Sequence, residues 1–135
     1  MRTLFTWMMA AAISVVAHTT LAIAADKPVL TIYTYESFTS EWGPGPAIET
    51  AFEENCNCDL QFVSLDSSIG ILGRVQLEGA GSKADIVLGL DTNLMATARD
   101  TGLFAPHGTR LAGRTSLPVD FSDDMFVPFD WGHFA

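Results

Sequence analysis

The chain has 135 residues, with 16 Asp and Glu against 7 Lys and Arg, which gives a formal net charge of −9 at pH 7. Binding to nucleic acid or to an anionic membrane surface needs a cluster of basic side chains, so an acidic chain without one suits neither partner. The charge is compatible with a cationic ligand, and it also keeps a secreted protein soluble.

Residues 1–25 have the layout of a secretory signal peptide. A basic second residue is followed by an apolar run at 8–16 and by the small residues that a signal peptidase recognises. This run is shorter than the roughly 20 apolar residues of a spanning helix, so we expect no stable membrane insertion. We predict cleavage after Ala24 or Ala25, which leaves residues 26–135 as one domain.

The mature chain begins with a predicted strand, loop and helix. Val29–Tyr35 is rich in β-branched and aromatic residues, which predicts a buried strand. Residues 36–45 form a loop that carries Trp42. Pro46 suits the first turn of a helix, which we expect to end near Asn55. One apolar face of this helix consists of Ile48, Ala51 and Phe52.

A second strand and helix follow. Asp59–Leu65 alternates in polarity and predicts a strand. Ser67 and Ser68 can cap the next helix, because their hydroxyl oxygens accept from free backbone N–H groups. This helix ends near Gly79, and its inward side chains are Ile71, Leu72 and Val75.

The third strand and helix complete the pattern. Residues 84–90 form a continuous apolar run, which is typical of a buried parallel strand. Asp91 or Thr92 caps a third helix, and Gly102 stands where a left-handed residue ends it. We expect this part of the chain to bury Leu94, Met95, Ala98, Leu103 and Phe104.

Alternation of strands and helices predicts an α/β fold, with a parallel sheet and helices on both of its faces. Periodicity is weak from 105 to 119, and 124–134 is extended and aromatic. In such folds, ligands bind beyond the carboxyl ends of the strands. The candidate binding residues are therefore those at the strand ends and an aromatic residue in the first loop: Tyr35, Trp42, Asp66, Ser67, Ser68 and Asp91.

Tyr35 and Trp42 suggest a flat cationic ligand, since a cation over an aromatic face gains roughly 0.5–2 kcal/mol. The alternative is that Tyr35 packs in the core and Trp42 braces a loop. For Ser67 and Ser68, helix capping is the default role, and donation from the helix end to a ligand is a second one.

Cys56 and Cys58 are the two cysteines, and they are separated by one residue. Export implies an oxidising compartment, but the ring closed by such a disulfide is small, so a local structural role is open in either the reduced or the bridged state. A metal site needs more ligands than this pair. The stretch 79–83 lacks the Walker spacing and precedes a strand, so it is not a phosphate loop. We expect no catalytic residue, no metal and no cofactor.

Five stretches of the chain resemble the periplasmic thiamine-binding proteins. They are VLTIYTYESFTSEWGPGP (29–46), AFEENCNCD (51–59), KADIVLGLDTNL (83–94), TGLFA (101–105) and FVPFDWGHFA (126–135). The WGPGP and CNCD segments are specific to this branch. The ADIVLGLD segment indicates only the wider superfamily of importer receptors.

The resemblance implies a two-lobed, hinge-closing binding protein of type II, located in the periplasm and monomeric. Thiamine or its phosphates would bind between the lobes and pass to the permease and ATPase subunits of an ABC importer. The family is more than twice as long as this chain. Residues 26–135 would be the N-terminal lobe, truncated near the hinge crossover with the second lobe largely missing. We therefore expect the isolated chain to bind thiamine weakly or not at all.

The resemblance also bears on the candidate residues. Tyr35 and Trp42 match family aromatics near the ligand, and Asp91 matches an acidic residue at the cleft edge. Ser67-Ser68 occupies a position that touches the ligand, but the family pattern there is Asp-Gly. This departure removes a carboxylate, for which Asp66 is the candidate replacement.

Two other functions remain as alternatives. A receptor for iron would need converging ligands, and Tyr33, Tyr35 and His133 are scattered; a polyamine receptor is a related alternative. A thiamine-degrading enzyme would need an activated cysteine in the cleft. The two cysteines precede the second strand, so they are expected at the end of the sheet opposite the predicted site.

Overall fold

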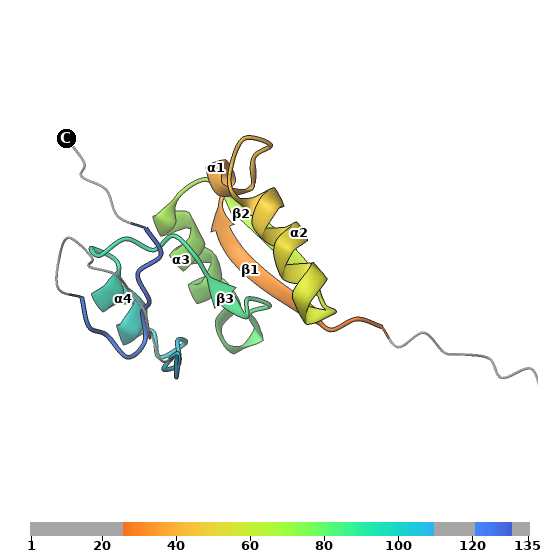
Figure 1. The fold of residues 1–135 in the computed structure, drawn as a ribbon. Helices are drawn as coiled ribbons and strands as arrows, with labels where there is room; N and C mark the ends of the chain where they lie inside the picture. The colour runs from red at the N-terminus through yellow and green to blue at the C-terminus, as the bar shows by residue number, and fades with distance from the viewer. Residues whose placement is uncertain (1–25, 110–120, 131–135) are drawn as a thin grey trace, which may run out of the picture.

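The computed structural model describes residues 26–109 and 121–130, which form a three-stranded parallel sheet with helices around it (Figure 1). The strands are β1 (Val29–Tyr35), β2 (Asp59–Leu65) and β3 (Ile86–Val87), in the order β2-β1-β3. The predicted signal peptide at 1–25 lies outside the described residues. So do most of the stretch at 105–119, where the periodicity is weak, and residues 131–135.

β1 and β2 have the predicted bounds and pair along their whole length. Val29 lies opposite Asp59, and Tyr35 lies opposite Leu65. This register brings the carboxyl ends of both strands to the same edge of the sheet. The predicted parallel arrangement is therefore confirmed.

β3 is shorter and more exposed than the predicted strand at 84–90. Only two residues pair with β1, although the backbone N–H groups of Asp85 and Leu88 also donate to carbonyls of β1. Ile86 is 45% exposed, and β3 has β1 as its one neighbouring strand among the described residues. Gly89, with φ of +101°, then turns the backbone out of the extended conformation.

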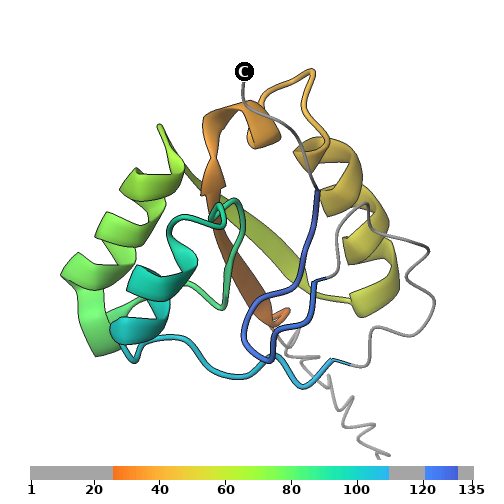
Figure 2. The ribbon, with the colours of Figure 1, turned by 90° about the vertical axis from the view of Figure 1, so that its left-hand side faces the viewer.

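The two longest helices lie on opposite faces of the sheet (Figure 2). α2 (Gly45–Cys56) connects β1 to β2, and α3 (Ser68–Glu78) follows β2. The connection through α2 leads from β1 outward to β2, and the connection through α3 leads back across β1 to β3. Because both connections have the same right-handed sense but opposite directions, their helices lie on opposite faces of the sheet. The prediction of helices on both faces is confirmed.

α3 buries the predicted side chains Ile71, Leu72 and Val75. Ile71 and Val75 form the buried core with Tyr33 of β1. The partly buried side chains packed around this core are Tyr35, Val63, Leu65, Ala84, Val87, Leu90 and Phe104.

The apolar face of α2 is not buried in the described part of the chain. Ile48 is 36% exposed and Phe52 is 42% exposed. The helix is rotated so that Glu53 faces the sheet, and its Oε1 accepts from the backbone N–H of Leu60 at 2.8 Å. A residue of α2 thereby satisfies a backbone donor at the outer edge of β2.

The predicted loop at 36–45 begins with a one-turn helix, α1 (Glu36–Thr39). This helix buries Phe38, which is 2% exposed. The turn that follows folds back tightly, since a Cβ on Gly43 would lie 2.3 Å from the carbonyl oxygen of Ser37. Glycine at this position allows the close approach.

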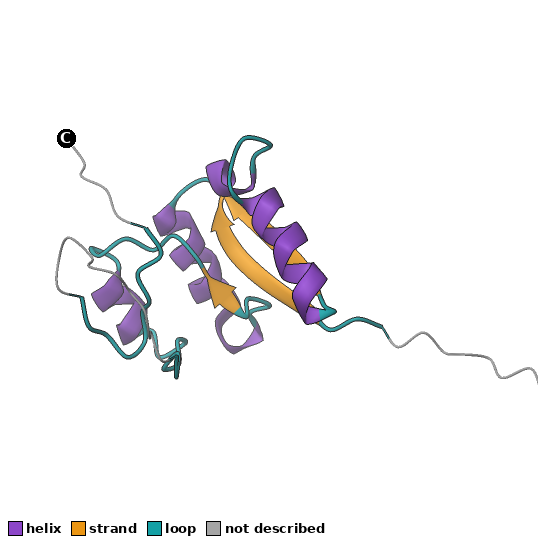
Figure 3. Cartoon of the chain, viewed as in Figure 1, coloured by secondary structure: helices purple, strands orange, loops and turns teal. Residues whose placement is uncertain are grey.

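Beyond β3 the chain forms the short helix α4 (Met95–Asp100), flanked by loops at 101–109 and 121–130 (Figure 3). The helix starts later than predicted, because Asp91 caps a turn ahead of it: its Oδ1 accepts from the N–H of Asn93 at 2.8 Å. Gly102 has the predicted positive φ of +66°. Ala98 is fully buried, whereas Leu103 is 37% exposed and so does not pack back as expected.

A single turn of 3₁₀-helix, η1 (Gly79–Gly81), ends α3 at the predicted break. None of the helices in 26–109 and 121–130 has the length and apolar character needed to cross a membrane.

Candidate functional site

The carboxyl edge of the sheet gathers most of the predicted binding residues. Tyr35 ends β1, and Asp66 follows its register partner Leu65 at the end of β2. Gly89, two residues before Asp91, touches the Tyr35 ring, since a Cβ there would lie 2.4 Å from the ring carbon Cδ1. Figure 1 shows α1 and the first turn of α3 beside the tip of β1.

Tyr35 is a half-buried side chain held between two neighbours. Its ring packs edge-to-face against Phe38, with centroids 5.8 Å apart and an interplanar angle of 73°, and Gly89 lies against it as well. Burial raises the pKa of Tyr35, and the nearby charge of Asp130 raises it further. The ring is fixed in orientation, so both proposed roles of Tyr35, in packing and toward a ligand, are compatible with its position.

Trp42 is exposed rather than packed. It lies on the turn between α1 and α2, with 80% of its surface accessible. Among the described aromatic pairs, none includes its ring. The structure therefore does not support the alternative in which Trp42 braces a loop, and the indole is free to stack.

The polar residues after β2 form a short chain of hydrogen bonds. Ser67 is the N-cap of α3, where its Oγ accepts from the N–H of Gly70 at 3.2 Å and its hydroxyl donates to Asp66 Oδ1 at 3.0 Å. This confirms the capping role of Ser67. Ser68 is the first residue of α3 and is half-buried, while the carboxylate of Asp66 is exposed and keeps acceptor capacity for a ligand.

Asp91 keeps part of its carboxylate available. One oxygen accepts from Asn93, as described above, and the side chain is half-buried at the carboxyl end of the β3 segment. The edge thus carries carboxylates after β2 and after the β3 segment.

No basic side chain of the described residues balances these carboxylates. Lys27 precedes β1 and Lys83 precedes β3, so both lie toward the amino edge. Arg74 on α3 is paired with Glu78, and Arg99 on α4 is paired with Asp123 and Asp124. As far as residues 26–109 and 121–130 are concerned, the carboxyl edge is therefore negative, which favours a cationic ligand.

Three residues that sequence analysis did not nominate lie at this edge. Phe38 of α1 packs against Phe62 of β2 and Phe129 of the 121–130 segment, with centroid distances of 5.6 and 5.7 Å. Asp130 is near enough to Tyr35 to influence its pKa. The sequence signals for Phe129 and Asp130 were the aromatic character of the stretch and the resemblance of 126–135 to the family, and neither says where the stretch folds back.

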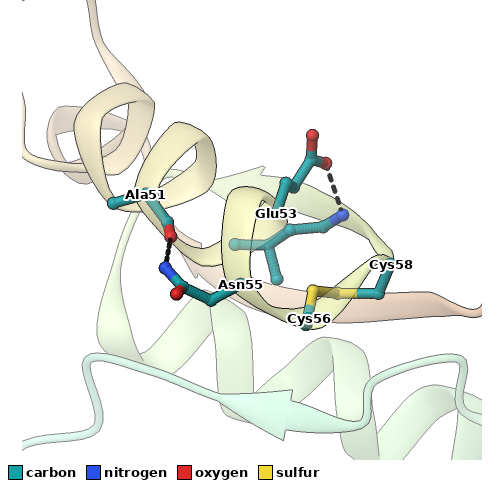
Figure 4. The surroundings of a disulfide bond; sticks show 6 residues. Ala51, Glu53, Asn55, Cys56 and Cys58 are labelled. Atoms are coloured by element: carbon teal, nitrogen blue, oxygen red, sulfur yellow. Dashed lines mark hydrogen bonds between the residues drawn. A yellow bond between two sulfur atoms is a disulfide. The ribbon is translucent and has the colours of Figure 1, made fainter.

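Cys56 and Cys58 form a disulfide at the amino edge of β2 (Figure 4). Of the alternatives left open, the bridged one is observed. Both cysteines therefore lie at the edge opposite the candidate site, as expected. Within 26–109 and 121–130, no three His, Cys, Asp or Glu side chains gather as a metal site would require.

The described residues also form an open groove of about 450 Å³ along the outer edge of β2. It lies between this edge and α2 and contains none of the predicted binding residues. Its lining consists of Thr39, Pro46, Glu49, Asp59, Leu60, Gln61, Phe62 and Ser64.

Comparison with known proteins supports the resemblance found in the sequence. The thiamine-binding periplasmic protein of Escherichia coli K12 is 52% identical over 109 residues, which are 81% of this chain and 33% of that protein. The protein of the same name from Brucella suis is 52% identical over 116 residues, covering 85% and 34%. The one from Haemophilus influenzae is 41% identical over 124 residues, covering 91% and 37%. The chain thus spans about a third of the length of these curated relatives.

A solved structure named periplasmic thiamin binding protein has the same fold over the shared region. It is 51% identical and superposes with a TM-score of 0.70, covering 76% of this chain and 32% of that one. No family model matches the chain. The α/β fold class is confirmed, whereas the predicted division into 1–25 and a lobe at 26–135 stays a prediction.

Proposed function

Because the chain is related, over about a third of their length, to the periplasmic thiamine-binding proteins, we propose that it forms one wall of a thiamine site in the periplasm. The observation that supports this most directly is the identity of about 50% to proteins of that name, combined with a carboxyl edge that is aromatic and negative. The wall acts by non-covalent capture, and no reaction is part of the proposal.

Thiamine carries a flat, positively charged ring, and the carboxyl edge matches this chemistry. The exposed indole of Trp42 offers a stacking face, and Tyr35 offers the exposed part of a ring already fixed by Phe38. Stacking of a cation on such faces contributes roughly 0.5–2 kcal/mol each. Asp66 and Asp91 add carboxylate oxygens, and Ser68 is the first residue of α3, next to the N-cap Ser67.

One wall buries less of a ligand than the 70–90% that is typical of small-molecule sites. The proposal therefore includes weak binding by the isolated chain, and submicromolar affinity in calorimetry would contradict it. Binding of thiamine phosphates, delivery to permease and ATPase subunits of an importer, and a monomeric state are further parts of the proposal, which the resemblance implies.

A thiamine-degrading activity is not favoured by the geometry. Such an enzyme would need a nucleophilic thiolate in the cleft. Cys56 and Cys58 are bonded to each other at the amino edge of the sheet. The related proteins are named as binding proteins.

A chimera tests the proposal. In the Escherichia coli relative, the matched segment is replaced by the matched 109 residues of this chain, and thiamine affinity is measured by calorimetry. We expect affinity within about tenfold of the parent, and a loss of at least about tenfold when Tyr35→Ala and Trp42→Ala are combined.

Leu77→Ala is the matched control for the chimera, because Leu77 is an apolar side chain on α3 with 85% exposure. It should leave thiamine affinity unchanged. A folded chimera that binds thiamine equally well with and without the two aromatic side chains would contradict the proposed site.

A further inference from the structure

Arg99 forms the ion pairs that hold the 121–130 segment against the rest of the chain. His107 holds the same segment, since its backbone N–H donates to the carbonyl of Asp124 at 2.9 Å and its Nε2 lies 3.2 Å from the carbonyl oxygen of Asp123. Arg99 Nη2 donates to Asp123 Oδ2 at 2.7 Å, and Nη1 donates to Asp124 Oδ1 at 3.3 Å. The same guanidinium lies over the ring of Phe126, 5.6 Å from its centroid. The pKa of Asp123 is lowered, first by the backbone N–H groups of Phe126 and Met125 that donate to it and then by Arg99.

A second set of contacts carries the end of this segment to the candidate site. Phe129 packs edge-to-face on Phe38, with centroids 5.7 Å apart, and Phe38 in turn packs on Tyr35. Phe38 is 2% exposed, whereas Phe129 keeps 56% of its surface accessible. One side of the Phe129 ring therefore completes the packing around Phe38, and the rest faces solvent at the carboxyl edge.

We propose that Phe129 and Asp130 belong to the ligand-binding surface, with Phe129 as an apolar wall and Asp130 as the counter-charge for a cationic aromatic ligand. This inference rests on the proposed function and adds two residues to the same site. It makes the 121–130 segment part of the binding surface rather than a connection that passes beside it.

The chemistry of Asp130 supports a role toward a ligand more than a role in folding. Its carboxylate is exposed and has no ion pair or hydrogen bond to other described residues. Beside it lies Tyr35, whose pKa is raised by burial and by this negative charge. A cation stacked near Tyr35 would lie between aromatic rings and a carboxylate, an arrangement in which both attractions act on the same charge.

The test uses the full chain labelled for NMR and compares two ligands in titrations that extend into the millimolar range. One is thiamine, and the other is a neutral isostere in which a thiophene replaces the thiazolium ring. We expect the resonances of Tyr35, Phe129 and Asp130 to shift together with thiamine. We expect Asp130→Asn to weaken thiamine binding by about fivefold or more and to leave binding of the isostere unchanged.

Asp100→Asn is the matched control, because it removes an exposed carboxylate from the end of α4 and should leave both affinities unchanged. If thiamine shifts Tyr35 and Trp42 but not Phe129 and Asp130, or if Asp130→Asn weakens both ligands equally, the inference is overturned and the proposed function stands. If thiamine shifts no resonance of the chain, the inference is overturned, and the chimera described above tests the proposed function separately.

Discussion

Gly89 is the residue at which the fold and the candidate site meet. Its positive φ ends β3, and its Cα lies against the ring of Tyr35. A side chain here would have to adopt an unfavourable backbone conformation and displace the ring at the same time. Glycine at 89 therefore permits both the turn and the position of the aromatic residue that we assign to the ligand.

We predict that Gly89→Ala lowers the free energy of unfolding by about 2–4 kcal/mol, because the new Cβ would lie 2.4 Å from Tyr35 Cδ1 at a positive φ. Denaturant unfolding measures this change. The control is Gly73→Ala within α3, where a Cβ meets nothing within 4 Å. It should raise stability by about 0.5–1 kcal/mol. Equal effects of the two substitutions would contradict the assigned contact.

Glu78 connects β1, α3 and the chain beyond α3 through its carboxylate. It accepts from the hydroxyls of Tyr33 at 2.9 Å and Ser82 at 3.0 Å, and also from Arg74 Nε. The hydrogen bond from Arg74 is the main reason that the pKa of Glu78 is lowered. Burial, and then the bond to Glu78, raise the pKa of Tyr33.

A lowered carboxyl pKa stabilises the fold above the unfolded pKa and loses that effect as the pH falls through the folded value. We therefore predict that Glu78→Gln is less stable than the parent near neutral pH, and that this difference shrinks below about pH 4. Denaturant unfolding from pH 7 to pH 2 measures it. Glu54→Gln, at an exposed position of α2, should follow the parent throughout. A difference between Glu78→Gln and the parent that is constant with pH would refute the assignment.

The disulfide ties two elements together at the amino edge of the sheet. α2 ends at Cys56, Asn57 adopts a left-handed conformation with φ of 51°, and Cys58 is buried just before β2. Figure 4 shows that Glu53, one turn earlier in α2, bonds the backbone of Leu60 on the same side. The turn from helix to strand is thus fixed by one covalent and one polar contact.

We predict that replacing both cysteines with serine lowers the free energy of unfolding by about 1.5 kcal/mol, because a disulfide that closes so short a loop restricts the unfolded chain only modestly. Hydrogen exchange should become faster at Leu60 and little changed at Ile71, in the core on the other side of the sheet. Ligand affinity should not change, since the disulfide lies at the opposite edge. A loss of thiamine binding in the folded double variant would show that the two edges are coupled.

The elements differ in how far their own sequence determines them. β1, β2 and α3 have the predicted bounds because local signals agree: β-branched strands, a serine cap and helical spacing of apolar residues. α1 was missed because it has four residues, and a single buried side chain, Phe38, anchors it through contacts from elsewhere. An apolar run at 84–90 indicates burial but not pairing, so the length of β3 was overestimated.

The whole molecule brings together residues that no local pattern relates. Tyr35, Asp66 and Asp91 could be predicted as neighbours, because parallel strands end at one edge. Phe129 and Asp130 could not, because their position depends on long-range contacts of the 121–130 segment, among them the ion pairs with Arg99 and the hydrogen bonds with His107. The site therefore consists of a part that topology predicts and a part that a few long-range contacts position.

Arg99 is therefore a positioning residue: it does not touch the ligand, but its removal should lower thiamine affinity by releasing the 121–130 segment. We predict that Arg99→Gln speeds hydrogen exchange across 121–130 while β1 and α3 keep their protection, because the segment loses both carboxylate contacts and the stacking on Phe126. Thiamine affinity should then fall by a factor similar to that of Asp130→Asn.

Combining Arg99→Gln with Asp130→Asn decides between positioning and a separate effect. If Arg99 acts by holding the 121–130 segment in place, the double variant binds thiamine no more weakly than the single variant with the lower affinity. The reason is that Asp130 no longer lies at the site once Arg99 is replaced, so that removing its charge has no further effect on affinity. If the two effects were independent, the fold-losses in thiamine affinity of the two single variants would instead multiply. Arg74→Gln removes the other ion-paired arginine of the described residues and should leave both the exchange of 121–130 and the affinity unchanged. Losses of binding free energy that add in the double variant would mean that Arg99 does not position Asp130 for the ligand.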